Sequence, residues 1–233
     1  MKDWRLLAES FSCLLFPSNC IHCQGELTGS LKLLCSTCLT QLETIDPRDR
    51  CPICFTDGCI CSKHEPRSYK RLGCCFEYEG PQKSLLIALK YQDRPYLAKS
   101  LASFMLLQYE QLGWQLPDYI TYIPQSFLRA HLRGYNQSAL LAEHFGNLLQ
   151  IPVVSLLKRT SFSLSQTLLP KEERKLLSPD IFACKTGISI QKKQILLIDD
   201  VFTTGQTAEC ASQSLQALEP SSIDFFCLMR TSL

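Results

Sequence analysis

Cysteine is concentrated in one part of this chain, and this concentration limits how that part can fold. Eleven of the fourteen cysteines lie between Cys13 and Cys75. Most come in close pairs, and we find no uninterrupted apolar stretch typical of an export signal, so metal ligation is favoured over a disulfide framework. Cys13, Cys74 and Cys75 lack paired spacing and are assigned to core or strand positions. The paired cysteines are predicted to fold around metal ions.

The first two pairs have the spacing of a structural zinc site. Two residues separate the cysteines of each pair, a spacer that lets one tight turn present both thiolates to a single zinc ion at about 2.3 Å. Two such turns complete a closed tetrahedral sphere with no open position for water. We therefore predict a zinc site made of Cys20, Cys23, Cys35 and Cys38.

The second predicted zinc site is less regular. We assign it to Cys51, Cys54, Cys59 and Cys61. One residue separates Cys59 from Cys61, whereas Cys61 and His64 have the usual two-residue spacer, so that either Cys59 or His64 can be the fourth ligand. A crossed arrangement, in which the two sites share ligands, is also open.

The charge balance argues against binding nucleic acid by overall attraction. The chain carries 24 basic and 22 acidic residues, and residues 1–65 carry six basic and eight acidic ones. Zinc held by four thiolates makes this segment more negative, so scaffolding or protein contact is favoured over DNA binding. No apolar run reaches the ~20 residues of a membrane span, and we expect a cytoplasmic protein.

The second part of the chain alternates strands with helices. Apolar residues recur at helical spacing over 96–113 and in a second helix that carries Leu141 and Phe145. The predicted buried strands lie at 119–123, 153–157, 194–198 and 223–228. This alternation predicts an α/β domain with a doubly wound, mostly parallel sheet covered on both faces. We expect a zinc-binding domain over 1–65 and the α/β domain over 66–233.

One predicted strand leads into the most informative stretch of the sequence. Four apolar residues precede Asp199 and Asp200, and a loop of small hydroxyl residues around Gly205 then opens a helix. Backbone N–H groups at a helix start can hold a phosphate, and glycine lets the backbone approach a ligand closely. Carboxylates at the carboxyl ends of parallel strands lie where open α/β sheets bind ligands. The stretch predicts a phosphate site beside two carboxylates.

This order of residues resembles the phosphoribosyl pyrophosphate (PRPP) loop of type I phosphoribosyltransferases, in which four apolar residues precede Asp-Asp-x-x-Thr-Thr-Gly-x-Thr. The resemblance implies that the two aspartates hold the ribose hydroxyls, directly or through Mg²⁺, and that residues 203–207 hold the 5′-phosphate. The PRPP-binding residues implied in this way are Asp199, Asp200, Val201, Phe202, Thr203, Thr204, Gly205, Gln206 and Thr207.

Motifs outside this loop narrow the resemblance to the ComF family, bacterial proteins with an N-terminal zinc ribbon and a phosphoribosyltransferase domain. The motifs are Leu89-Lys90-Tyr91, Ile123-Pro124, Arg133-Gly134-Tyr135-Asn136-Gln137, Gln166 with Leu168 or Leu169, and Arg174 ahead of Phe182. The resemblance covers nearly the whole chain, and Leu177 departs from it because the family usually has asparagine there. Some members of that family are needed for the uptake of transforming DNA.

The resemblance implies a glycosyltransferase reaction in which an acceptor displaces pyrophosphate from PRPP. Because guanidinium groups bind phosphate oxygens in bidentate fashion, Arg129 or Arg133 is expected to face the pyrophosphate. Arg133, Asp199 and Asp200 are the expected catalytic residues. Lys90 alone is typical of a solvated helix residue, and only the family pattern assigns it to the site. The acceptor has no recognised signature.

Two other classes of function stay open at this point. A PRPP-binding fold can serve as a non-catalytic sensor, or as an adaptor that handles incoming single-stranded DNA with protein partners, because binding a ground state and stabilising a transition state are separate demands. A zinc-ribbon nucleic-acid binder with a vestigial second domain is disfavoured by the acidic balance of residues 1–65.

Overall fold

The computed structural model describes residues 19–27, 33–59, 67–126, 134–160, 181–185 and 187–231. The chain forms two compact units, a small unit of Met1–Glu43 with Glu79–Ala88 and a large unit of Thr44–Tyr78 with Leu89–Leu233. The predicted domain boundary between residues 65 and 66 falls outside the described residues and stays a prediction. Within the described ranges, no helix combines the length and apolar character needed to cross a bilayer.

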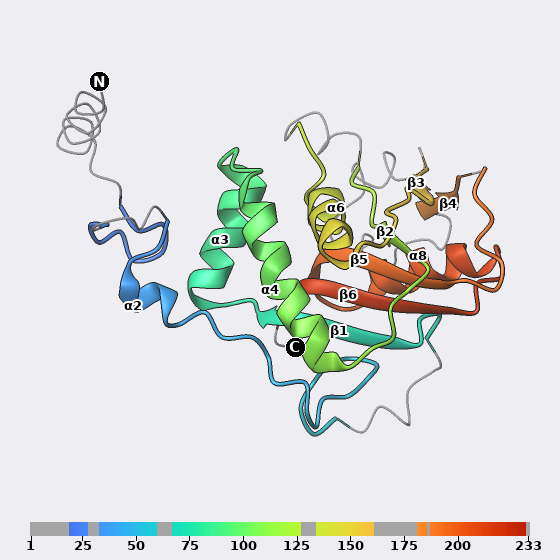
Figure 1. Cartoon of the computed structure of the whole chain (residues 1–233), viewed down its shortest axis with the longest axis horizontal. Coiled ribbons are helices and arrows are strands. Elements are labelled where there is room, and N and C mark those ends of the chain that lie inside the picture. Colours follow the sequence, from blue (N-terminus) through green and yellow to red (C-terminus); the bar gives the residue numbers. More distant parts are fainter. Residues whose placement is uncertain are drawn as a thin grey trace, which may run out of the picture. The chain divides into compact units, whose positions relative to one another are not determined.

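A four-stranded sheet forms the centre of the large unit (Figure 1). Its strands, in spatial order, are β1 (Arg71–Glu77), β6 (Ser222–Arg230), β5 (Gln194–Phe202) and β2 (Tyr119–Tyr122). All three neighbouring pairs are parallel. Parallel pairing brings the carboxyl ends of the four strands to one edge of the sheet, the edge at which such folds bind ligands.

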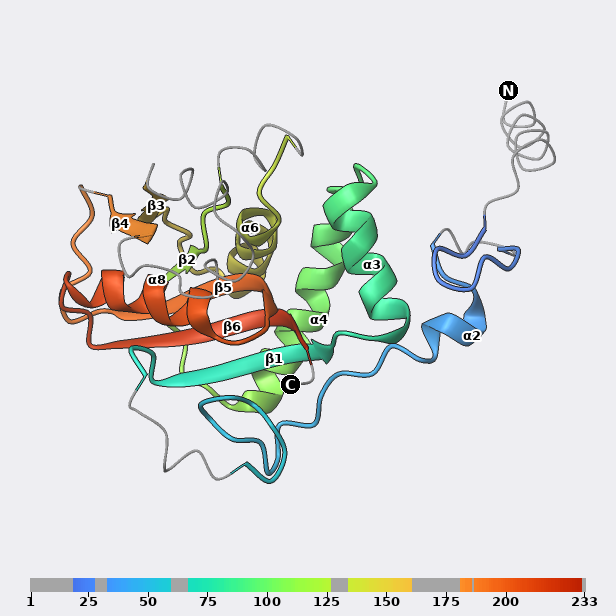
Figure 2. The ribbon, with the colours of Figure 1, turned by 180° about the vertical axis from the view of Figure 1, so that it is seen from behind.

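Helices cover both faces of this sheet. One face packs against α4 (Leu97–Leu112) and α6 (Gln137–Leu149), and the other against α8 (Gln206–Gln216), as Figures 1 and 2 show from opposite sides. Successive residues of β6 mark the division, because Phe226 contacts the ring of Phe145 in α6, whereas Phe225 shares a core cluster with Leu215 of α8. The predicted α/β class with a parallel sheet and an additional cysteine-rich segment is confirmed.

The remaining elements are shorter or lie outside the sheet. They are α2 (Ser36–Leu39), α3 (Gly80–Tyr91), and the antiparallel pair β3 (Leu157–Arg159) and β4 (Phe182–Cys184). α6 begins where the side chain of Asn136 accepts hydrogen bonds from the backbone N–H groups of Ser138 and Ala139, the N-cap arrangement that asparagine favours.

Three strands differ from the sequence-based prediction. The run 153–157 makes only a single parallel bridge, between Val153 and Ile120, and β3 begins at its last residue and pairs with β4 instead. The pattern of apolar residues in the sequence does not predict β1 as a strand with defined bounds. The predicted burial of Cys74 and Cys75, which lie in β1, is confirmed. β5 continues beyond the two aspartates to Phe202, because β6 extends far enough to pair with it.

Candidate functional site

A cleft of about 390 Å³ lies at the carboxyl edge of the sheet, and we call it the carboxylate cleft. Its volume falls within the range of small-ligand sites. Residues at or just beyond the ends of all four strands contribute to it. The lining residues are Tyr78, Lys90, Tyr91, Ile123, Pro124, Gln125, Asn136, Gln137, Ser138, Arg159, Asp199, Asp200, Val201, Thr203, Thr207 and Thr231.

Asp199 is the most deeply buried charged group in this cleft, with 8% of its surface exposed. Burial, together with the charge of neighbouring Asp200, raises the pKa of its carboxyl group to about 7. Its Oδ1 accepts hydrogen bonds from Ser138 Oγ (2.9 Å) and from the backbone N–H of Asp200 (2.8 Å), which hold the group in place. The carboxylate is therefore positioned but poorly solvated, and a cation would favour its charged form.

Lys90 reaches into the cleft from the last turn of α3. Its Nζ lies 2.9 Å from Asp200 Oδ1, and only 15% and 16% of the two side chains are exposed. The hydroxyl of Tyr135 donates a hydrogen bond to the carbonyl of Leu89 (2.6 Å), which ties this end of the helix to the loop before α6. Lys90 is therefore not the solvated helix residue that its local pattern alone suggests, and it lines the carboxylate cleft.

The loop between β5 and α8 contains a turn that requires glycine. Gly205 adopts a φ of 79°, in the left-handed region that side chains disfavour. A Cβ atom there would lie 2.8 Å from Cζ of Phe202, which is itself buried. The glycine is therefore needed for the backbone conformation and for the packing of Phe202, in addition to any approach of a ligand.

The predicted PRPP-binding residues occupy different environments. Asp199, Asp200, Val201, Thr203 and Thr207 line the carboxylate cleft. Phe202 and Gly205 are buried, and neither they nor Thr204 and Gln206 line it. Arg129 and Arg133 lie outside the described residues.

Several residues of the cleft have a role that becomes visible only in the structure. Ser138 positions Asp199, and Asn136 caps α6 while its Nδ2 donates to the carbonyl of Ile123 (3.0 Å). Arg159 comes from β3 and adds a second basic side chain. Only the Asn-Gln-Ser start of α6 carries a sequence signal, since an N-cap residue marks where the helix begins. Arg159 has none, because its place depends on the pairing of β3 with β4, which lies more than 20 residues further along the chain.

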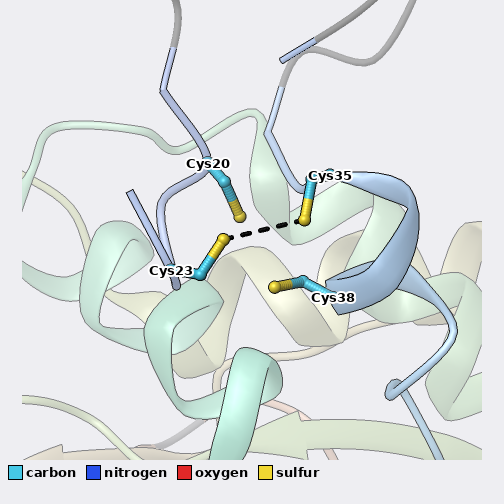
Figure 3. Close-up of side chains that lie close together, drawn as sticks. All are labelled: Cys20, Cys23, Cys35 and Cys38. Atoms are coloured by element: carbon cyan, nitrogen blue, oxygen red, sulfur yellow. Dashed lines mark hydrogen bonds between the residues drawn. The ribbon is translucent and has the colours of Figure 1, made fainter. Parts of the chain in front are cut away.

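The first predicted zinc site is assembled in the small unit (Figure 3). The Sγ atoms of Cys20, Cys23, Cys35 and Cys38 all lie within 4.8 Å of one another, and those of Cys23 and Cys35 are 3.7 Å apart. A tetrahedron around an ion with ligands at 2.3 Å has edges of about 3.8 Å. Burial and the neighbouring sulfurs raise the pKa of Cys38 to about 12, so four thiolates together require a cation. The donor set therefore fits zinc.

The second predicted site shares its local geometry with the first. The backbone N–H of Gln24 donates to the carbonyl of Cys20 (2.9 Å), and that of Phe55 donates to Cys51 in the same way (2.8 Å). Gln24 and Phe55 occupy equivalent positions with φ values of 63° and 56°, and an antiparallel bridge flanks each turn. The two turns have the same backbone geometry, and we call each of them a cysteine knuckle.

Cys51 and Cys54 of the second knuckle lie with Cys59 in a group whose Sγ atoms are within 4.8 Å of one another. Cys61 and His64 lie outside the described residues, so the identity of the fourth ligand stays open. Unlike the first group, this one belongs to the large unit.

The second knuckle is bonded into the large unit through its backbone. Arg230, which is 3% exposed, donates from Nη1 to the carbonyl of Phe55 and from Nη2 to Thr56 Oγ1 (3.1 Å). The hydroxyl of Tyr69 donates to the carbonyl of Ile53 (2.9 Å). Phe55 itself is 2% exposed and part of the core cluster around α8. This knuckle is therefore a structural part of the unit that holds the carboxylate cleft.

We expect the purified protein to contain two zinc ions per chain, one for each cysteine group. Cys20→Ser should reduce the content to one, because a structural site needs its full set of thiolates. Elemental analysis of the wild-type protein and of the variant checks this expectation. Cys184→Ser, which changes a cysteine outside both groups, should leave the zinc content unchanged. A content of one zinc ion per wild-type chain would show that the second cysteine group does not bind zinc.

Sequence comparisons relate nearly the whole chain to curated proteins, although no family model matches it. Competence protein F of Haemophilus influenzae is 28% identical over 225 residues, which cover 92% of this chain and 98% of the relative. The DNA utilization protein YhgH of Escherichia coli K12 is 28% identical over 94% of this chain and 99% of its own length. Competence protein ComFC of Streptococcus pneumoniae is 28% identical over 95% and 94%.

Solved structures similar to this chain include phosphoribosyltransferases. The adenine phosphoribosyltransferase of Leishmania donovani has a TM-score of 0.38 and 18% identity over 62% of this chain and 68% of its own. The glutamine PRPP amidotransferase of B. subtilis also has a TM-score of 0.38, with 17% identity over 58% of this chain and about a quarter of its own. Matches over more than nine-tenths of the chain therefore relate it to competence protein F, YhgH and competence protein ComFC, in agreement with the resemblance that its motifs indicate.

Proposed function

We propose that the carboxylate cleft binds PRPP together with Mg²⁺ and transfers its phosphoribosyl group to an acceptor. The observation that carries this proposal is the convergence of two carboxylates, Asp199 and Asp200, with the β5–α8 loop in one cleft at the carboxyl edge of a parallel sheet. Carboxylate oxygens are the ligands that Mg²⁺ takes in nucleotide and phosphate sites. The donor set of this cleft therefore fits the ion.

Each group in the proposed site has a defined task. Asp199 and Asp200 hold the ribose hydroxyls or the metal, and the β5–α8 loop with Thr203, together with Thr207 in the first turn of α8, receives the 5′-phosphate. Bound Mg²⁺ would supply positive charge to the pyrophosphate as it leaves. Arg129 and Arg133 are proposed to face the same group, by resemblance to the family. The leaving group needs this charge more than the reaction needs a base, because the transition state is oxocarbenium-like.

The biological context comes from the names of the relatives. Two of them are called competence proteins and a third a DNA utilization protein. We propose that this chain likewise acts in the uptake or use of DNA, with an acceptor still to be identified. A non-catalytic PRPP-binding adaptor is the alternative, and it differs from the enzyme in one observable, the release of pyrophosphate.

The direct test uses Asp199→Asn/Asp200→Asn. The wild-type protein, incubated with PRPP, Mg²⁺ and a metabolite extract, should release pyrophosphate, and the double variant should not. Ligand-induced stabilisation gives a second measurement, because any ligand of the native state raises the melting temperature. A PRPP shift without pyrophosphate release would support the adaptor. A double variant that folds, fails to bind PRPP and still supports DNA uptake would contradict both.

The folded state of the ligand-free Asp199→Asn variant is expected to be at least as stable as wild type at neutral pH. The pKa of Asp199 rises from 3.8 to about 7 on folding, so the native state binds more protons than the unfolded chain between these values and loses stability as pH increases through them. Asparagine keeps the oxygen that accepts from Ser138 and removes the charge. Denaturant unfolding across this pH window should show a shallower decline for the variant.

A further inference from the structure

Lys90 forms an ion pair with Asp200, a carboxylate that binds the ligand in the proposed function. Their charged atoms are 2.9 Å apart and both side chains are about five-sixths buried. Two charges so removed from water attract each other more strongly than exposed charges do, and removing one of them leaves the other buried at a high cost. Lys90 is therefore a fixed part of the ligand-free cleft.

The cleft is lined by as many basic as acidic side chains. Its charged lining residues among those described are Lys90, Arg159, Asp199 and Asp200. The ammonium group lowers the repulsion between the adjacent carboxylates, and its charge acts on Asp199 as well as on Asp200. Lys90 thus supplies to the carboxylates the positive charge that a metal ion would otherwise supply.

A metal ion and the ammonium group compete for the same oxygen. Asp200 Oδ1 lies at hydrogen-bonding distance from Nζ, and a divalent cation bound there would repel a positive charge at that distance by Coulomb's law. The lysine stem is long and flexible, and ammonium is a common phosphate ligand. When a ligand brings both a metal ion and a pyrophosphate group, the metal ion takes the place of Lys90 at Asp200. The pyrophosphate group then becomes the new partner of Lys90.

We propose that Lys90 is an exchangeable cation, which neutralises Asp200 in the ligand-free protein and moves to the pyrophosphate group when a metal–pyrophosphate ligand binds. This inference rests on the proposed function, and it predicts opposite effects of the lysine on two probes. Lys90 weakens the binding of a divalent cation alone and strengthens the binding of pyrophosphate.

The experiment compares wild type with Lys90→Met, which keeps the apolar stem and removes the charge. Mn²⁺ binding without other ligands, followed by electron paramagnetic resonance, should become about tenfold tighter in the variant, as expected when a like charge is removed from its neighbourhood. Binding of inorganic pyrophosphate at saturating Mg²⁺, followed by calorimetry, should become about tenfold weaker.

Two further variants separate charge from packing. Lys90→Arg keeps the charge, so Mn²⁺ should bind it as weakly as it binds wild type. Lys99→Met removes a charge from an exposed position of α4 and should change neither affinity. Lys90→Gln replaces Lys90→Met if the latter does not give a cooperative thermal transition, and the same two shifts are expected of it.

Other outcomes overturn the inference. Weaker binding of both probes would make Lys90 a structural residue, and unchanged binding of both would make its pairing with Asp200 irrelevant to ligands. If either result is obtained while wild type binds PRPP normally, only the role of Lys90 fails. If wild type binds neither Mn²⁺ nor pyrophosphate, the proposed function fails with it.

Discussion

Phe55→Ala is expected to lower the free energy of unfolding of the large unit by about 3–5 kcal/mol, the usual cost of removing a buried aromatic side chain. Phe55 is 2% exposed and packs in the core cluster that includes α8 and β6. Phe55 directly follows Cys54 of the second cysteine group, and its carbonyl accepts from the buried Arg230, so the backbone around the ring has little freedom to close the space. Urea unfolding, with zinc content measured in parallel, checks this expectation.

The first knuckle provides a matched control for this prediction. Gln24 occupies the position equivalent to Phe55, with a similar positive φ, but it is exposed. Gln24→Ala should change stability by no more than about 0.5 kcal/mol, as surface substitutions usually do. Equal effects of the two substitutions would show that the second knuckle contributes no more to a folded core than the first.

Gly205→Ala is expected to remove PRPP-induced stabilisation and to lower the stability of the ligand-free protein by about 2–5 kcal/mol. A left-handed conformation costs a residue with a side chain about 1–2 kcal/mol, and overpacking adds about 1–3 kcal/mol. The second cost applies here because the new Cβ would lie 2.8 Å from the ring of Phe202. Displacement of that ring would move the loop that carries Thr203 and the start of α8, which carries Thr207. Thermal melting with and without PRPP and Mg²⁺ measures both effects.

Gly113 separates the two costs. Its φ is 61°, and no atom lies within 4 Å of the position that a Cβ would take. Gly113→Ala should therefore carry only the backbone cost and leave the PRPP shift intact. A Gly205→Ala protein that melts like Gly113→Ala and keeps its PRPP shift would show that contact with Phe202 does not position the loop.

The sequence carries most of the information about elements with a strong local pattern. The stripe of Leu97, Leu101 and Met105 predicts α4, and the apolar run before Asp199 predicts β5, because helix and strand periodicities appear directly in the order of residues. β1 is harder to predict, since Gly73-Cys74-Cys75 has none of the β-branched residues typical of strands. Its parallel partner β6 lies at the other end of the chain.

The site was predictable to the extent that its chemistry is local. Asp199, Asp200 and the loop after them are contiguous, and the structure brings most of them to one cleft. The contacts of Lys90 with Asp200 and of Ser138 with Asp199 join residues more than 60 positions apart. No pattern within a single segment encodes such a distance, because it follows from how the whole sheet is assembled.

The bonds between Arg230 and the second knuckle limit where this protein can be shortened. A fragment that begins at Thr44 keeps every residue of the large unit, whereas one that begins at Arg67 keeps Arg230 and loses Phe55 and Thr56, which accept its hydrogen bonds. Glu77 Oε2, 3.8 Å from Arg230 Nε, would remain, but a buried charged donor that loses its hydrogen-bond acceptors costs about 1–3 kcal/mol or more. Arg230 also lies next to Thr231 of the cleft, and its carbonyl accepts from the N–H of Tyr78. The turn that carries Cys51 and Cys54 therefore supports one side of the cleft. A chain without this turn would need other contacts to hold Tyr78 and Thr231 in place.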